Sequence, residues 1–168
     1  MKTSSTSASG FTLIEMLVVL TVVGILTVIA LPSFKSLSQS QRVKNASYEL
    51  FSGLSQTRSE AIKRNTDTTL AITTNAKSEP GWTISATPAS GVVQIPIRTQ
   101  TNISSIAMTI TGLTAPVQVV YHRSGRTTTA AAVTFQIDAA GVSTPTPFVR
   151  CITIELSGMP RVRQGICP

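Results

Sequence analysis

The sequence predicts an α+β fold, in which one long N-terminal helix precedes a head built from short antiparallel strands. Three observations predict this fold. Residues 11–31 are almost entirely apolar, and residues 32–65 carry apolar side chains at three- and four-residue spacing. Residues 66–168 are rich in Thr, Val, Ile and Ser, with Gly and Pro between the runs. A helix packed on an antiparallel β-sandwich, or on two small sheets, accommodates this order of elements.

The first element, residues 11–31, is long enough to cross a membrane, because about 20 apolar residues span a hydrocarbon core. Glu15 is its only ionisable side chain. A carboxylate in such a segment is costly unless a cation compensates it. Cleavage between Gly10 and Phe11 would create an amine four residues from Glu15, about one helical turn away. That amine can pair with Glu15 of the same chain or of a neighbouring chain.

Two other interpretations of this segment remain. An ordinary secretory signal would be cut near Ala30, but residues 1–10 are polar and carry only Lys2 as a positive side chain. A simple membrane anchor leaves Glu15 unexplained. Lys35, Arg42 and Lys44 follow the segment, so a count of positive charges would place the C-terminal side in the cytoplasm.

The second element, residues 32–65, continues the helix in amphipathic form. Val43, Leu50 and Leu54 belong to its apolar face, and charged residues fall between them. We expect this face to pack on the head.

The head, residues 66–168, contains seven strand candidates separated by turn signals. The predicted strands are residues 68–74, 82–87, 92–98, 103–111, 117–123, 132–138 and 150–156. The predicted turns are Pro80-Gly81, Ser90-Gly91, Ser124-Gly125, Ala140-Gly141 and Ser157-Gly158, and residues 143–147 are predicted to form an exposed loop.

The chain has two cysteines, Cys151 and Cys167. In an exported protein a disulfide between them is the simplest interpretation, and it would stabilise the C-terminal tail by about 3 kcal/mol. The alternative is two free thiols or half of a metal site, for which no neighbouring His or second Cys pair provides further ligands.

The run Gly10-Phe11-Thr12-Leu13-Ile14-Glu15, followed by an apolar helix, resembles the class III signal of type IV pilins and pseudopilins. The resemblance implies that a prepilin peptidase cuts after Gly10 and methylates the amine of Phe11. It also implies that Glu15 directs each subunit into a growing filament, and that Pro32 marks the place where the helix bends. A bacterial inner-membrane location, with a cytoplasmic leader and a periplasmic head, follows from the same resemblance.

The whole chain resembles the GspH/FimT family of minor pilins and minor pseudopilins, with FimT-like features. The order of signal, long helix, β-rich head and basic tail carries this resemblance, together with residues 119–126, residues 133–137 and the run Cys151-Ile152-Thr153-Ile154. It implies a minor subunit in the initiating or tip complex of a type IV pilus. The alternative is a minor pseudopilin of a type II secretion system. Other pilins or pseudopilins and inner-membrane lipid are the expected partners.

Basic residues are the candidates for a binding function, since Lys and Arg number 14 against 7 Asp and Glu. In an extended tail Arg161 and Arg163 would share one face, where their guanidinium groups suit phosphate oxygens. We expect Arg150, Arg123 and Arg126 nearby. FimT-like proteins linked to DNA uptake carry a C-terminal Gly-Arg-x-Arg motif, but here Met159 and Pro160 separate Gly158 from the Arg-x-Arg. Binding of double-stranded DNA without sequence preference is one hypothesis. Pairing with Glu155 or with a neighbouring subunit is the other.

The sequence offers little for catalysis. His122 is its one histidine, and the seven acidic residues form no pair at short spacing. We expect no enzymatic activity, no metal and no cofactor. An exported enzyme with a simple anchor is a third class, and it would have a mature N-terminus other than Phe11.

Overall fold

The computed structural model of the 168-residue chain describes residues 10–77, 79–87, 94–114, 116–129, 131–141 and 146–168, and it describes only the backbone of residues 30–32. Four predictions fall wholly or partly outside this description: residues 1–9 of the leader, the turn Ser90-Gly91, residues 92–93 of the predicted strand 92–98, and residues 143–145 of the exposed loop.

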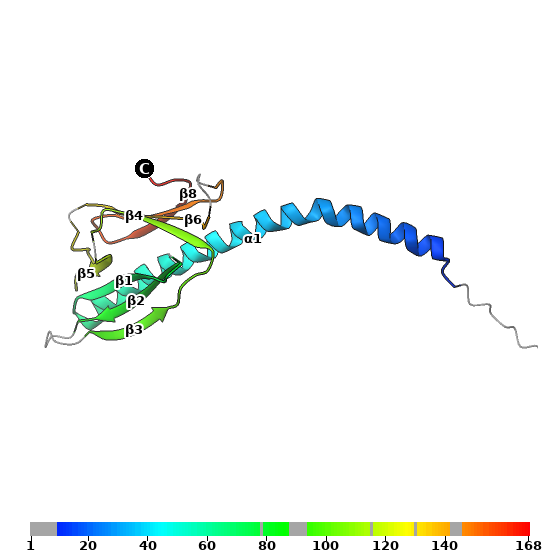
Figure 1. Cartoon of the computed structure of the whole chain (residues 1–168). Coiled ribbons are helices and arrows are strands. Elements are labelled where there is room, and N and C mark those ends of the chain that lie inside the picture. The colour runs from blue at the N-terminus through cyan, green and yellow to red at the C-terminus, as the bar shows by residue number, and fades with distance from the viewer. Residues whose placement is uncertain (1–9, 78, 88–93, 115, 130, 142–145) are drawn as a thin grey trace, which may run out of the picture. The chain divides into compact units, whose positions relative to one another are not determined.

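One helix precedes eight strands (Figure 1). The elements are α1 (Leu13–Arg64), β1 (Thr68–Thr74), β2 (Pro80–Ala86), β3 (Ile95–Gln100), β4 (Ile106–Thr111), β5 (Gln118–Tyr121), β6 (Val133–Ala139), β7 (Arg150–Ile154) and β8 (Pro160–Gln164). They form two four-stranded antiparallel sheets with strand orders β3-β2-β1-β5 and β4-β6-β7-β8. The predicted α+β class and the two small sheets are confirmed.

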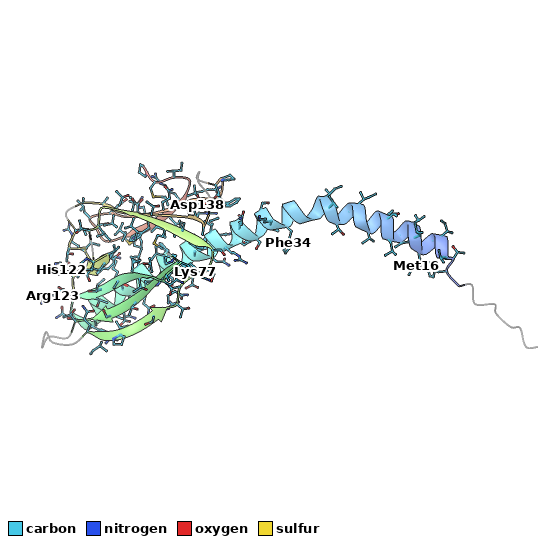
Figure 2. All side chains as sticks on the ribbon, in the orientation of Figure 1. Met16, Phe34, Lys77, His122, Arg123 and Asp138 are labelled. Carbon is cyan, nitrogen blue, oxygen red and sulfur yellow. A yellow bond between two sulfur atoms is a disulfide. The ribbon has the colours of Figure 1, made fainter. Side chains whose placement is uncertain are left out.

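The chain divides into two compact units, residues 1–38 and residues 39–168, and α1 contributes to both. In the first unit the described large apolar side chains are exposed, and Figure 2 shows Met16 and Phe34 projecting from the helix. Leu20 is 67% exposed. The helix is intact there because its backbone hydrogen bonds are internal, whereas its apolar surface is left uncovered.

The second unit, which we call the head, has one core made by α1 and both sheets. α1 contributes Val43, Leu50 and Leu54, all fully buried. From the two sheets come the other large buried side chains: Leu70, Trp82, Ile84, Val119 and Tyr121 from the first sheet, and Ile106, Val133, Phe135, Ile137, Ile152 and Ile154 from the second. In the part of α1 that belongs to the head, the predicted apolar face of residues 32–65 therefore packs into the core.

Several predicted strand boundaries differ from the observed ones by up to three residues, and two of them are wrong for a local reason. Pro80-Gly81 does not form a turn but lies in β2, paired with Thr73 and Thr74. The described turn residues are Ala76 and Lys77 instead, and the Asn75 side-chain oxygen accepts the N–H groups of Lys77 and Glu79. The strand predicted from residue 103 begins only at Ile106, since Ser105 has a φ of 63° and interrupts the extended chain.

The C-terminal tail forms a strand that the pattern of seven runs did not include. β8 pairs antiparallel with β7, with Val162 opposite Ile152 and Arg163 opposite Cys151. The predicted disulfide joins Cys151 to Cys167, and the Cys167 N–H donates to the Gln136 side chain at 3.3 Å. The tail is thereby tied to β7 and β6.

Candidate functional site

The predicted processing site lies immediately before α1. Gly10 and Phe11 are exposed and non-helical, and Phe11 is 82% exposed. Thr12 caps the helix, because its side-chain oxygen accepts the Glu15 N–H at 3.3 Å. Glu15 is exposed in the first turn, where the helix dipole favours a negative charge. Gly10, Phe11 and Glu15 are thus all exposed, and their roles in processing and assembly stay predictions.

Of the described residues, no single straight helix has the length and apolar composition needed to cross a membrane, but one bent pair of helical segments, Leu13–Ile29 and Ser33–Arg64, has both. Pro32 lies between these segments within α1. Its side chain is outside the described part of the chain, so its role in the bend stays a prediction.

Arg161 and Arg163 share the outer face of β8. Their side chains are exposed, while Val162 between them packs against the core. The Arg161 Nε lies 3.1 Å from the Glu155 Oε1, whereas no carboxylate partner is found for Arg163 among the described residues. Arg161 is therefore paired with Glu155, and Arg163 is exposed without a carboxylate partner among the described residues.

Arg150 does not join this pair, because it lies on the opposite face of the second sheet. It stands opposite Ile137, which is fully buried, and two positions from the buried Ile152. The Arg150 Nε is buried without a hydrogen-bond partner among the described residues. The expectation that Arg150 gathers with Arg161 and Arg163 is wrong for that reason.

Arg123 and Arg126 belong to the exposed turn after β5. Figure 2 shows Arg123 beside His122 at this turn. The turn approaches the β7–β8 connection, since a Cβ added to Gly158 would lie 3.2 Å from the Arg126 Cα. Arg126 thus lies near the turn that precedes β8, but among the described residues no hydrogen bond joins Arg123 or Arg126 to Arg161 or Arg163.

His122 has a structural role in this turn. Its Nδ1 lies 2.9 Å from the Asp67 Oδ1, and its backbone N–H donates to the Arg126 carbonyl at 2.9 Å. Both side chains are about half exposed. The contact ties the end of β5 to the residue that precedes β1.

Sequence reasoning missed a junction at Arg58, which α1 directs toward two turns of the head. The Arg58 Nε donates to the Gly125 carbonyl at 2.9 Å, and its Nη1 lies 3.2 Å from the Met159 sulfur. These partners are 67 and 101 residues away in the chain. In the helical pattern Arg58 is one of several charged residues between apolar positions, and nothing local marks it.

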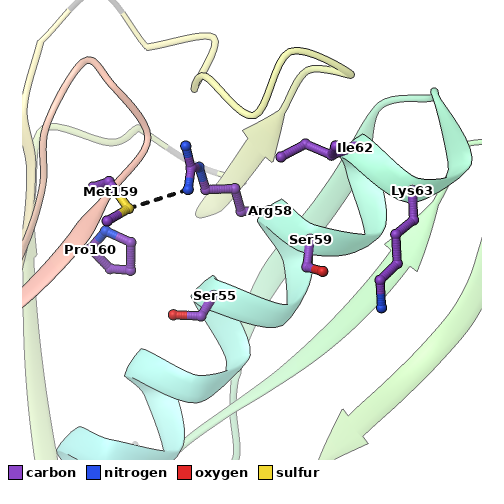
Figure 3. A pocket seen from close by; sticks show the side chains of 7 residues that line it. All are labelled: Ser55, Arg58, Ser59, Ile62, Lys63, Met159 and Pro160. Atoms are coloured by element: carbon purple, nitrogen blue, oxygen red, sulfur yellow. Dashed lines mark hydrogen bonds between the residues drawn. The ribbon is translucent and has the colours of Figure 1, made fainter.

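A groove adjoins this junction (Figure 3). Its volume is about 360 Å³, and its lining consists of Ser55, Arg58, Ser59, Ile62, Lys63, Met159 and Pro160. Helix α1 supplies the polar and basic part together with the apolar Ile62, and the other apolar side chains are those of Met159, just before β8, and Pro160, its first residue. Among the described residues, no group of three or more His, Cys, Asp or Glu side chains could hold a metal ion.

Comparison with known proteins adds two sequence matches. The family described as type II transport protein GspH matches residues 46–158. A prokaryotic N-terminal methylation motif matches residues 6–31. No curated protein matches the chain by sequence.

Solved structures with a similar fold come from two kinds of filament system. The type IV minor pilin FimU of Pseudomonas aeruginosa is 21% identical with a TM-score of 0.58, covering 75% of this chain and 90% of FimU. The minor pseudopilin EpsH from the type 2 secretion system of Vibrio cholerae is 18% identical with a TM-score of 0.55, covering 73% of this chain and 97% of EpsH. At this identity the likeness concerns the fold.

The matches confirm the resemblance drawn from the signal and from the order of elements. The GspH match runs from the amphipathic part of α1 to the β7–β8 turn and covers more than half of the sequence. The methylation motif includes Gly10, Phe11 and Glu15. This chain belongs to the GspH family and, with its N-terminal methylation motif, is a minor pilin-like or pseudopilin-like subunit.

Proposed function

We propose that this chain is a membrane-anchored minor subunit of a type IV pilus, acting in the initiating or tip complex. The observation that carries the proposal is the pairing of a folded head with a helix whose first part is apolar and exposed, with Glu15 in its first turn. Such a helix needs lipid before assembly and the helices of other subunits after it. A prepilin peptidase would cut after Gly10 and methylate Phe11, leaving residues 11–31 in the inner membrane and the head in the periplasm.

Deletion and complementation in the source bacterium test this proposal. Loss of the chain should reduce the pili that can be sheared from the cell surface, and the wild-type chain should restore them. Glu15→Ala should not restore them, because the variant keeps the anchor but lacks the carboxylate. Ser36→Ala is the control, since it changes an exposed polar side chain on the same helix.

The alternative is a minor pseudopilin of a type II secretion system. The GspH description and the likeness to EpsH support it, just as the likeness to FimU supports a pilus subunit. The same deletion separates the two. A pilus subunit predicts fewer surface pili with normal protein secretion, and a pseudopilin predicts lost secretion with normal pili.

We also propose that the subunit acts by assembly rather than by catalysis. The support is that FimU and EpsH, which share its fold, are named as a pilin and a pseudopilin. A mature N-terminus other than Phe11 would favour the third class, an exported enzyme with a simple anchor.

DNA capture through Arg161 and Arg163 remains a second proposal, supported by their exposure on one face of β8. Binding of double-stranded DNA should depend steeply on salt, with a slope of about 0.9 per phosphate contact. Changing both arginines to Ala should lower that slope by about 1–2. Arg98→Ala is the matched control, because Arg98 lies in β3 of the first sheet and is paired with Glu49 of α1. Equal slopes for all three proteins would remove the proposal.

A further inference from the structure

The charge of Arg58 has no counter-charge within the described part of the head. Arg58 is only partly exposed, yet no carboxylate of a described residue lies within 4.0 Å of its guanidinium. Its two contacts, the Gly125 carbonyl and the Met159 sulfur, are neutral. A partly buried charge held only by neutral partners gains stability when an anion reaches it.

The two turns that contact Arg58 hold its guanidinium in place. Gly125 and Gly158 have φ values of 74° and 80° and donate their N–H groups across tight turns to His122 and Glu155. The two turns are in close contact, since a Cβ added to Gly158 would lie 2.1 Å from the Gly125 carbonyl oxygen. A guanidinium fixed before its ligand arrives loses less conformational entropy on binding.

The groove beside Arg58 combines hydrogen-bond donors with an apolar wall. Ser55 and Ser59 present hydroxyl groups from successive turns of α1, as Figure 3 shows, and Lys63 follows one turn later. The Lys63 ammonium lies 4.0 Å from Glu60, but that carboxylate lies only 2.7 Å from the Arg64 Nε. No carboxylate lines the groove itself, so its charge is positive.

Two of the three apolar residues of the lining, Ile62 and Met159, are exposed, and the third, Pro160, is buried. The accessible fractions are 49% for Ile62 and 50% for Met159, and Pro160 completes the wall. A volume of about 360 Å³ suits one or two side chains of a peptide rather than a polymer. A phosphate backbone would need a row of cations along an extended channel, and this groove instead ends in apolar side chains.

We propose that this groove binds a segment of a partner protein that presents a carboxylate next to an aliphatic or aromatic side chain. The carboxylate pairs with Arg58 and Lys63 and accepts from the serine hydroxyls, while its neighbour covers Ile62 and Met159. The proposal adds a partner contact to the head and holds equally for a pilus and for a pseudopilus.

A peptide titration of the full chain in nonionic detergent micelles tests the proposal. The methyl groups of methionine and isoleucine are isotopically labelled for NMR. The probe is N-acetyl-Glu-Leu-amide, and its uncharged match is N-acetyl-Gln-Leu-amide. The probe should shift the Met159 and Ile62 signals to saturation and leave Met16 unchanged. The uncharged match should bind at least about tenfold more weakly, because it lacks the charge-assisted hydrogen bonds.

Four variants test whether the peptide binds in this groove, and some of them leave the contacts that hold the head together unchanged. Arg58→Gln should abolish binding, but this change also removes two contacts between α1 and the turns. Ser59→Phe fills the groove without touching those contacts, and it should abolish binding as well. Lys63→Gln removes the charge of a side chain that is 70% exposed and should weaken binding severalfold. Lys44→Gln removes an exposed charge elsewhere on α1 and should leave binding unchanged.

Several outcomes would overturn the proposal. These are equal affinity for the two peptides, undiminished binding by the Ser59→Phe and Lys63→Gln variants, or no shift of Met159 with the glutamate peptide. Inorganic phosphate and a short DNA duplex are titrated separately as alternative ligands. A shift of Met159 by either of these, without one by the peptide, would also overturn it.

Discussion

Leu20 and Leu54 lie on the same helix, yet Leu20 is 67% exposed and Leu54 is fully buried. The first belongs to the unit of residues 1–38 and the second to the head. Along the first unit the large apolar side chains from Phe11 to Leu37 are exposed wherever they are described, whereas Val43, Leu50 and Leu54 enter the core.

The difference shows what each unit needs from outside the chain. Burial of a leucine side chain contributes about 1.5–3 kcal/mol, and the head obtains this within its own core. The described large apolar side chains of the first unit are exposed, and under the proposed function they would be buried by lipid or by other subunits. The head therefore buries its apolar side chains within the chain, whereas the proposed function assigns the burial of the first unit to membrane and filament.

The largest expected effect is the loss of head stability on Leu54→Ala, compared with Leu20→Ala in the first unit. Leu54→Ala should lower the free energy of unfolding of the head by about 2–5 kcal/mol, because it leaves a cavity in the core. Leu20→Ala should leave that free energy unchanged. Trp82 is the only tryptophan and is buried in the core, so its fluorescence during denaturation of the full chain in detergent reports the head alone. Equal losses for the two variants would contradict the separation of the units.

Loss of the disulfide should affect only the head. Changing Cys151 and Cys167 together to Ser should lower the free energy of unfolding by about 3 kcal/mol, because the unfolded chain gains freedom. The same denaturation measurement applies, and reductant added to the wild-type chain should reproduce the loss. A double variant as stable as the wild type would show that pairing with β7 alone holds the tail.

A smaller effect should come from the turns that meet at Arg58. Gly141 and Gly158 have nearly the same φ, 78° and 80°, but of the two only Gly158 has a carbonyl oxygen of a described residue where a Cβ would stand. Gly158→Ala should therefore cost about 1–3 kcal/mol more than Gly141→Ala, which carries the backbone strain alone. Equal costs in denaturation would mean that the two turns are not packed together.

The smallest effect concerns Glu79, which ties the β1–β2 turn to Ser105. The Asn75 side-chain amide donates to its carboxylate at 2.8 Å and the Ser105 N–H at 3.1 Å, and these bonds, with nearby Lys77, lower the pKa of Glu79. The stability that the ionised Glu79 contributes to the head is fully present above the ordinary pKa of a glutamate, about 4.3. It is lost as the pH falls through the lowered pKa of Glu79. Glu79→Gln should flatten the dependence of head stability on pH below about 4.3. Parallel curves for variant and wild type would contradict this role.

Most of the fold could be predicted because its signals are local. The periodicity of Val43, Leu50 and Leu54 marks the buried face of α1, and β1 was predicted with its correct bounds. β8 was missed because Pro160, Arg161 and Arg163 weaken its strand pattern, and pairing with β7 overrides that pattern. The turn at Asn75 was misplaced because Pro80-Gly81 is the stronger sequence signal, although the Asn75 side chain makes the turn.

Some residues of the candidate sites could be recognised from the sequence, and others depend on the fold. Gly10, Phe11 and Glu15 are adjacent in sequence, so their motif could be recognised without a structure. The basic cluster depended on tertiary placement, which put Arg150 on the opposite face from Arg161 and gave Arg161 a partner in Glu155. Arg58 could not be identified at all, because its two contacts come from turns that only folding brings together.

Mass spectrometry of the mature N-terminus tests the central claim most directly. The chain would be purified from membranes of its source bacterium and digested, and its first peptide would be sequenced. We predict that the mature protein begins at Phe11 with a methylated amine and that the Gly10–Phe11 bond is uncut when prepilin peptidase is absent. An intact leader in wild-type cells, or a mature protein that begins at any other residue, would contradict the account.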